Sequence, residues 1–118
     1  MNKRINTIEY NLNIIISSEY KDFIIKYGLI SDNFEVYGYI ENIDIDKIPC
    51  VIGATYLYKE TYKKISSNEI VIAFDDYLNS PIILNTDNNN IYCIKDNNKV
   101  LIETSFNLWL QKYKDTNE

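Results

Sequence analysis

The chain has 118 residues and a mass of 13.9 kDa, which suits one domain with a single hydrophobic core. Its formal net charge of −5 and pI near 4.7 argue against binding to nucleic acid, because phosphate contacts need clustered Lys and Arg. The sequence has no apolar run of about twenty residues, which argues against a membrane-spanning helix, and its lack of histidine removes the usual general base and the commonest transition-metal ligand.

The amino terminus and the cysteines indicate a cytoplasmic protein. Glu9, Asn11 and Asn13 interrupt the continuous apolar core that a signal peptide would need. Cys50 and Cys93 lie far apart in the sequence, without the spacing of a zinc site or a redox motif, which favours two reduced, buried thiols. A glycine-rich phosphate loop is also missing, so we expect no metal, no cofactor, no catalytic residues and no enzymatic activity.

Two helices are predicted near the amino terminus. Ile5, Ile8 and Leu12 fall at helical spacing and predict a short first helix. The second helix has an apolar stripe at positions i, i+3, i+4 and i+7, a serine cap before it and a glycine after it. The stripe is Tyr20, Phe23, Ile24 and Tyr27, the cap is Ser17 or Ser18, and the glycine is Gly28.

The middle of the chain predicts a half-exposed strand, an acidic loop and a third helix. From Phe34 to Glu41 the side chains alternate between two faces of a strand. Residues 41–47 are expected to form a loop or an irregular edge. Pro49 suits the first turn of the following helix, although Gly53 weakens that helix. Its shared face would hold Val51, Ala54, Tyr58 and Tyr62.

The last third predicts a β-meander and a closing helix. The run from Ile70 to Phe74 is apolar throughout, as expected for a central strand covered on both faces. Turns rich in Asp and Asn, at 75–80, 87–90 and 96–98, separate the strands that follow. In the closing helix Trp109 belongs to an apolar stripe with Phe106, Leu110 and Tyr113, which predicts a core position for its indole.

Together these elements predict an α+β fold with one domain over residues 1–118. The sheet would be antiparallel, with about five or six strands, and the helices would pack mainly on one face.

Several blocks of sequence, in their order and spacing, resemble one known family. The blocks are Asn11 to Ile14 with Glu19 to Gly28, then Glu35-Val36-Tyr37-Gly38, Val51 to Thr55, Ile70 to Ile72, and Thr104-Ser105-Phe106. They resemble the SUKH superfamily, the Smi/Knr-like proteins known chiefly as bacterial immunity proteins and eukaryotic cell-wall regulators. The chain departs from the family pattern at Ile16-Ser17-Ser18, where a proline is usual, and at Leu29, where a second glycine is common.

The resemblance implies a non-enzymatic inhibitor that binds a cognate protein toxin. Many such toxins act on nucleic acid and carry basic clefts, so an acidic surface is suited to occupy the cleft in place of phosphate. The eukaryotic relatives imply an alternative, a regulatory interaction domain that serves another cellular partner. A small enzyme that uses Asp75 and Asp76 is a third interpretation. We expect a monomer or weak dimer in the cytoplasm, with a basic partner and no contact with nucleic acid or membrane.

The candidate contact residues for such a partner are carboxylates and tyrosines. The best polar cluster is Asp75, Asp76, Tyr77 and Asn79, which either caps a turn, contacts a toxin or holds a metal or catalytic site. A second acidic segment is either a solvated loop or a binding rim; it holds Glu41, Asp44 and Asp46. Tyrosine supplies interface area at low entropy cost, and the tyrosines expected to be exposed are Tyr37, Tyr39, Tyr56 and Tyr58.

Overall fold

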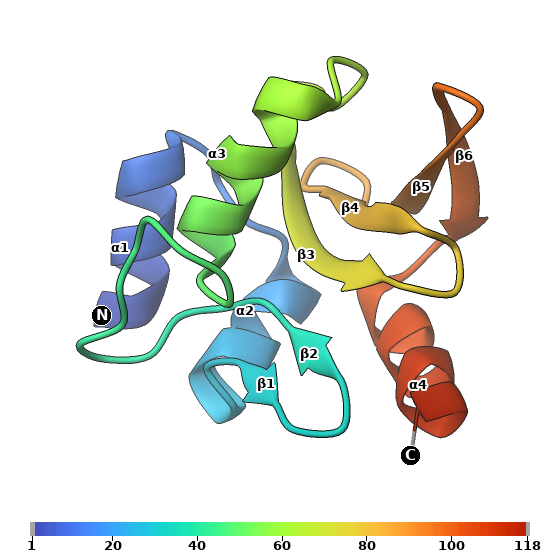
Figure 1. Ribbon diagram of the computed structural model, residues 1–118. Helices are drawn as coiled ribbons and strands as arrows, with labels where there is room; N and C mark the ends of the chain where they lie inside the picture. The colour runs from blue at the N-terminus through green and yellow to red at the C-terminus, as the bar shows by residue number, and fades with distance from the viewer. Residues whose placement is uncertain (1, 118) are drawn as a thin grey trace.

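The computed structural model describes residues 2–117 as four helices and two antiparallel sheets (Figure 1). The helices are α1 (Lys3–Leu12), α2 (Ser18–Lys26), α3 (Val51–Thr61) and α4 (Phe106–Asn117). The small sheet pairs β1 (Ile30–Ser31) with β2 (Glu35–Val36). The main sheet is a meander in the order β3 (Glu69–Asp75), β4 (Ser80–Asn85), β5 (Ile91–Lys95) and β6 (Asn98–Glu103). The predicted α+β class is confirmed, with the strands divided between two sheets.

The two amino-terminal helices follow their predicted apolar stripes except at Tyr27, which is the C-cap of α2 and is half exposed. Asn2 caps α1, because its Oδ1 accepts the backbone N–H groups of Arg4 and Ile5 at 2.9 and 3.3 Å. Gly28 follows α2 with a φ of +76°, the left-handed conformation that glycine adopts without strain. Ser17 occupies the N-cap position of α2, but its hydroxyl donates to Oδ1 of Asn89 and makes no capping bond.

The strand predicted from Phe34 to Glu41 is much shorter in the structure, since β2 covers only Glu35 and Val36, and beyond it Gly38 makes an isolated parallel bridge with Cys50. The backbone of Gly38 passes so close to Gly28 that a Cβ would overlap the carbonyl oxygen of Gly28. The N–H of Tyr37 instead donates to the carbonyl of Ile72 in β3 at 2.7 Å. The strand pattern therefore ends after Val36, because the residues around Tyr37 and Gly38 pack between α2 and the main sheet.

The predicted middle helix is confirmed, but it begins later than the proline suggested. Cys50 is the N-cap and Val51 the first residue of α3, so Pro49 lies outside the helix. Gly53 is required by packing, because a Cβ there would lie 2.5 Å from backbone atoms of Asp46 and Lys47. The acidic loop thus runs directly against the first turn of α3.

Strand β3 is buried from Glu69 to Ala73, but it forms the edge of the main sheet and not its centre. Two contacts cover it. The N–H of Val71 donates to Oγ1 of Thr55 in α3 at 3.0 Å, and the segment around Tyr37 lies along its outer side. An apolar strand at the edge is stable here because other elements cover its exposed side.

Helix α4 closes the core through aromatic side chains. The Phe106 ring meets Tyr20 and Phe23 of α2 edge to face, with centroids 5.3 and 5.4 Å apart. Trp109 is buried, as predicted, and stacks on Tyr113 at 4.8 Å. None of the helices within residues 2–117 has both the length and the apolarity needed to cross a membrane.

Candidate functional site

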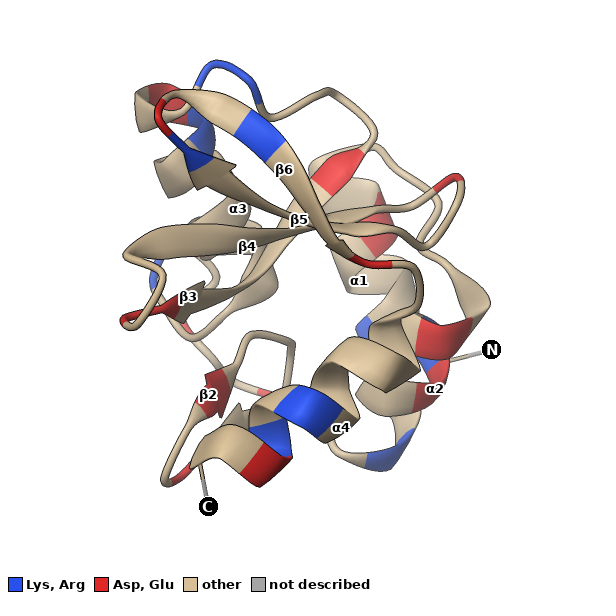
Figure 2. Cartoon of the chain, turned by 90° about the vertical axis from the view of Figure 1, so that its right-hand side faces the viewer, with Lys and Arg blue, Asp and Glu red and all other residues tan. Residues whose placement is uncertain are grey.

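A groove of about 610 Å³ opens between three segments that are distant in the sequence. They are the β1–β2 turn, the end of β3 with the turn that follows it, and the last turns of α4. Figure 2 shows acidic residues on β2 and at the end of β3, on the side where α4 approaches its C-terminus. We call this site the acidic groove, and its carboxylates are Asp32, Glu35, Asp75 and Asp76.

The charge of the acidic groove is not neutralised within the molecule. Among residues 2–117 none of its four carboxylates forms an ion pair with a lysine or arginine. Asp75 caps its own turn, because its Oδ1 accepts the N–H of Leu78 at 3.0 Å, and Glu35 accepts the hydroxyl of Ser31 at 3.2 Å. Both donors are uncharged, so neither bond neutralises the carboxylate that accepts it.

Aromatic side chains of Phe34, Phe74 and Tyr113 also line the groove. Phe34 meets Tyr113 edge to face at 5.6 Å, and Phe74 stacks on Tyr58 at 5.7 Å. Burial, with the nearby charges of Asp75, Asp76 and Glu35, raises the pKa of Tyr113 to about 12. Its hydroxyl therefore stays protonated at neutral pH and donates to the carbonyl oxygen of Phe74 at 3.4 Å. The site therefore combines carboxylates with packed aromatic side chains.

The rim also carries exposed apolar surface. Tyr77 is 95% exposed at the tip of the β3–β4 turn, and Leu78 beside it is exposed as well. Asn79 takes a φ of +51°, so its role here is to form the turn. Of the predicted cluster, Asp75, Asp76 and Tyr77 line the acidic groove, and Asn79 supports the turn that carries them.

The second predicted acidic segment does not join this site. Glu41 binds Arg4 of α1 through two side-chain nitrogens, with Nη2 at 2.9 Å from Oε1 and Nε at 3.1 Å from Oε2. Asp44 accepts the N–H of Asp46 at 3.0 Å and lies 3.9 Å from Nζ of Lys47. In Figure 1 this loop passes beside α1, across the molecule from the β3–β4 turn. The chain therefore has two separate acidic surfaces.

The tyrosines predicted to be exposed divide between surface and core. Tyr37 is only 3% exposed, so its predicted role as a surface contact is wrong. Tyr37 belongs to the hydrophobic core, and burial raises its pKa. Tyr39 is partly buried against the core, and its N–H donates to the carbonyl of Gly28 at 2.9 Å. Tyr56 is exposed, and Tyr58 is partly buried and stacks on Phe74.

The groove residues that were not predicted from the sequence include Asp32, Phe34, Glu35 and Tyr113. Asp32 and Asn33 form a turn, and their composition was a usable signal for one. Nothing in the local pattern indicated that this turn would face residues some forty positions later. The convergence arises from tertiary packing of the β1–β2 hairpin against α4 and the end of β3.

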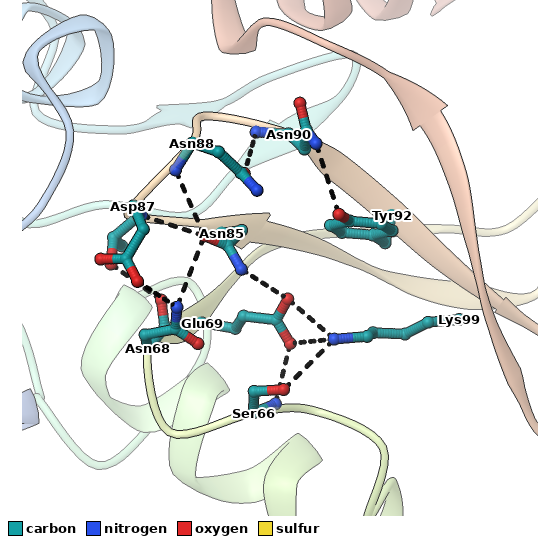
Figure 3. Close-up of polar contacts among 10 residues, drawn as sticks. Ser66, Asn68, Glu69, Asn85, Asp87, Asn88, Asn90, Tyr92 and Lys99 are labelled. Carbon is teal, nitrogen blue, oxygen red and sulfur yellow. Dashed lines mark hydrogen bonds and ion pairs between the residues drawn. The ribbon is translucent and has the colours of Figure 1, made fainter.

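A second polar cluster lies at the opposite end of β3 (Figure 3). The Glu69 carboxylate is fully buried and accepts Nζ of Lys99 at 2.8 and 2.9 Å, the N–H of Ser66 at 2.8 Å and Nδ2 of Asn85 at 3.2 Å. Burial alone would raise the pKa of Glu69, but these donors outweigh it and hold the pKa below its ordinary value. Because its bonds are satisfied internally, this cluster is structural.

The Asn-rich turn beside that cluster is also organised by its own side chains. Oδ1 of Asn85 accepts the N–H groups of Asp87 and Asn88 at 3.0 and 3.3 Å, as drawn in Figure 3. Within the described part of the chain no group of three or more Cys, Asp or Glu is placed to hold a metal ion. Comparison with protein-family models and with curated proteins gave no match. Function must therefore be argued from the acidic groove itself.

Proposed function

We propose that this chain is an immunity protein of the SUKH type that neutralises a basic protein toxin through the acidic groove. The observation that carries the proposal is the meeting of four carboxylates, from two segments of the chain, around one concave site without a lysine or arginine partner among residues 2–117. Such a site attracts cations that a toxin would otherwise present to phosphate groups. The partner is therefore a protein with a basic cleft.

Charge and apolar surface have different tasks in this mechanism. The carboxylates, with a formal net charge of −5 on the whole chain, speed the approach of a basic partner. Tyr77 and Leu78 on the rim then supply contacts that bury apolar area and slow dissociation. Asp75 also holds the turn that presents these two side chains, so its capping bond serves the same surface.

The test is a pair of charge reversals with equal effect on the net charge. Glu35→Lys/Asp76→Lys changes the acidic groove and leaves the capping carboxylate of Asp75 in place. Asp44→Lys/Asp46→Lys is the matched control on the other acidic surface. Each pair raises the formal net charge by four, from −5 to −1. The groove variant should slow association about tenfold at low salt and flatten its salt dependence, whereas the control should change association by less than about threefold.

The toxin for this measurement is the product of the neighbouring gene, provided that it kills cells when expressed alone. Association is followed by stopped flow or surface plasmon resonance over a salt series, and cell survival is scored with each variant. Equal slowing by both pairs would show that only net charge matters, and would contradict a role for the groove. Failure of the wild-type protein to bind or protect would contradict the immunity function.

A further inference from the structure

A second hollow adjoins the acidic groove along α4. The hollow has a volume of about 280 Å³ and shares Asp32, Asn33 and Phe34 with the acidic groove, so the β1–β2 turn is a wall common to both. Its other apolar lining comes from Tyr27, Ile30 and Leu110. We call the two together the furrow.

The two ends of the furrow differ in chemistry. The acidic end carries Glu35, Asp75 and Asp76, and it shares Asp32 with the apolar end. The apolar end is lined by side chains that include Tyr27, which is 50% exposed although it is aromatic. The charges lining this end are those of Asp32 and Lys114, which are of opposite sign. A ligand along the furrow would therefore meet strong negative potential at one end and apolar surface at the other.

We propose that the furrow binds an extended segment of a protein partner that has cationic side chains at one end and an apolar side chain at the other. The identification of that partner as a toxin rests on the proposed function, but the recognition itself does not. Charge complementarity selects lysine or arginine for the acidic end. Nucleic acid is disfavoured by the same carboxylates.

The geometry also sets the spacing within that segment. Leu110 lines the apolar hollow, and Asn117 lines the acidic groove, seven residues later in α4. Tyr113, three residues after Leu110, lines the acidic groove as well, so at about 1.5 Å per helical residue the two ends of the furrow are roughly 5 to 10 Å apart along the axis. An extended chain covers that distance in about two to three residues. The cationic and apolar side chains should therefore lie about two to four residues apart.

Short synthetic peptides test this recognition without the toxin. The probe has two arginines, two alanines and a leucine, and is made in both chain directions with blocked ends. One control peptide replaces the arginines by glutamates, and another replaces the leucine by serine. Titration into ¹⁵N-labelled protein should shift amide signals around residues 32–35, 75–78 and 110–114 with a dissociation constant of about 1 mM, as expected for so small a ligand. The glutamate peptide should not bind.

Protein variants assign each end of the probe. Tyr27→Ser should weaken binding of the leucine peptide about fivefold and leave the serine peptide nearly unchanged, because only the leucine contacts the apolar hollow. Tyr10→Ser is the matched control, since Tyr10 is an exposed tyrosine of α1 that lies outside the furrow. Glu35→Lys/Asp76→Lys should weaken both arginine peptides about tenfold.

The outcomes separate this inference from the proposed function. Equal affinity for the leucine and serine peptides, or no binding of either, would overturn the inference, while toxin capture through the acidic groove would still support immunity. If the probe binds as expected but the protein neither captures nor neutralises the toxin, the furrow would be supported as a peptide-binding site and the immunity function would be overturned. Association of the protein with itself that is lost in Tyr27→Ser would show that a second copy occupies the site, and would also overturn the inference.

Discussion

Glu69 keeps its charge although its side chain does not reach solvent. Four donor contacts from three residues hold it there, and they tie the start of β3 to the end of β4 and to β6. A buried carboxylate left without its cation is strongly destabilising, because its desolvation is no longer compensated. Lys99 is therefore important for stability even though its side chain is 26% exposed.

We predict that Lys99→Met lowers the free energy of unfolding by about 2 to 3 kcal/mol at pH 7, somewhat less than the roughly 3–5 kcal/mol of a wholly buried pair. Lys112→Met is the matched control. It removes a lysine that lies 2.7 Å from Glu103, but this lysine is 73% exposed, so the loss should stay below about 1 kcal/mol. Urea denaturation followed by Trp109 fluorescence measures both. Equal losses of unfolding free energy in the two variants would show that burial of Glu69 does not determine the cost of removing its lysine.

The same pair predicts a pH dependence. The folded-state pKa of Glu69 lies below its unfolded value, so the pair stabilises fully above an unfolded pKa of about 4.3, and this contribution is lost as the pH falls through the folded pKa. The difference in stability between the wild type and Lys99→Met should therefore be largest near neutral pH and shrink toward pH 3. A constant difference would mean that Lys99 contributes through packing alone.

At the scale of elements, Gly53 shows how packing overrides helix propensity. In an exposed helix interior, replacing glycine by alanine stabilises by about 1 kcal/mol. Here the new Cβ would lie 2.5 Å from backbone atoms of Asp46 and Lys47, which cannot move without displacing the acidic loop. The loop and α3 therefore fit together only with glycine at this position.

We predict that Gly53→Ala destabilises the protein by about 1 to 3 kcal/mol, the usual cost of overpacking, despite the gain in propensity. Thr61→Ala is a useful control, because Thr61 is an exposed residue at the end of α3 and its replacement should be neutral or slightly stabilising. Urea denaturation decides the sign. Stabilisation by Gly53→Ala would show that the loop moves away from α3 at little cost.

Local patterns predicted the elements well where a helix packs a single apolar stripe against the core. The stripes of α2 and α4 are examples, and Trp109 is buried as its position in the stripe required. The prediction failed for the length of the strand beginning at Phe34, because the close approach of Gly38 to Gly28 is a tertiary contact that no alternation reveals. Likewise an apolar run marked β3 as buried, but burial does not say whether a strand is central or at an edge.

The candidate site was predictable only in part for the same reason. The Asp and Asn residues after β3 indicated a polar turn, and that turn carries half of the groove's carboxylates. Asp32 and Glu35 come from a separate hairpin, and only the folded chain brings the two segments together. The segment with Glu41 had the same composition, yet its bond to Arg4 places it on another surface.

At the scale of the whole molecule, the groove depends on the integrity of one core. The Cα radius of gyration is 12.9 Å, close to the roughly 13.5 Å expected for one compact domain of this length. Helix α4, which forms one wall of the groove, is attached by aromatic packing and by Glu19 of α2. Its Oε1 accepts the hydroxyl of Ser105 and the N–H of Asn107, each at 2.9 Å. Helix α4 should therefore not unfold before the rest of the domain.

We predict a single cooperative unfolding transition, because small domains with one shared core usually unfold in two states. Trp109 reports on α4 by fluorescence, and far-ultraviolet circular dichroism reports on all helices, so their urea midpoints should coincide. Glu19→Ala should lower both midpoints together. The free energy of unfolding should fall by about 1 to 2 kcal/mol, as expected for loss of a capping carboxylate. An earlier fluorescence transition in the wild type would instead show that α4 detaches first, and the groove would then be a site that opens and closes in the folded protein.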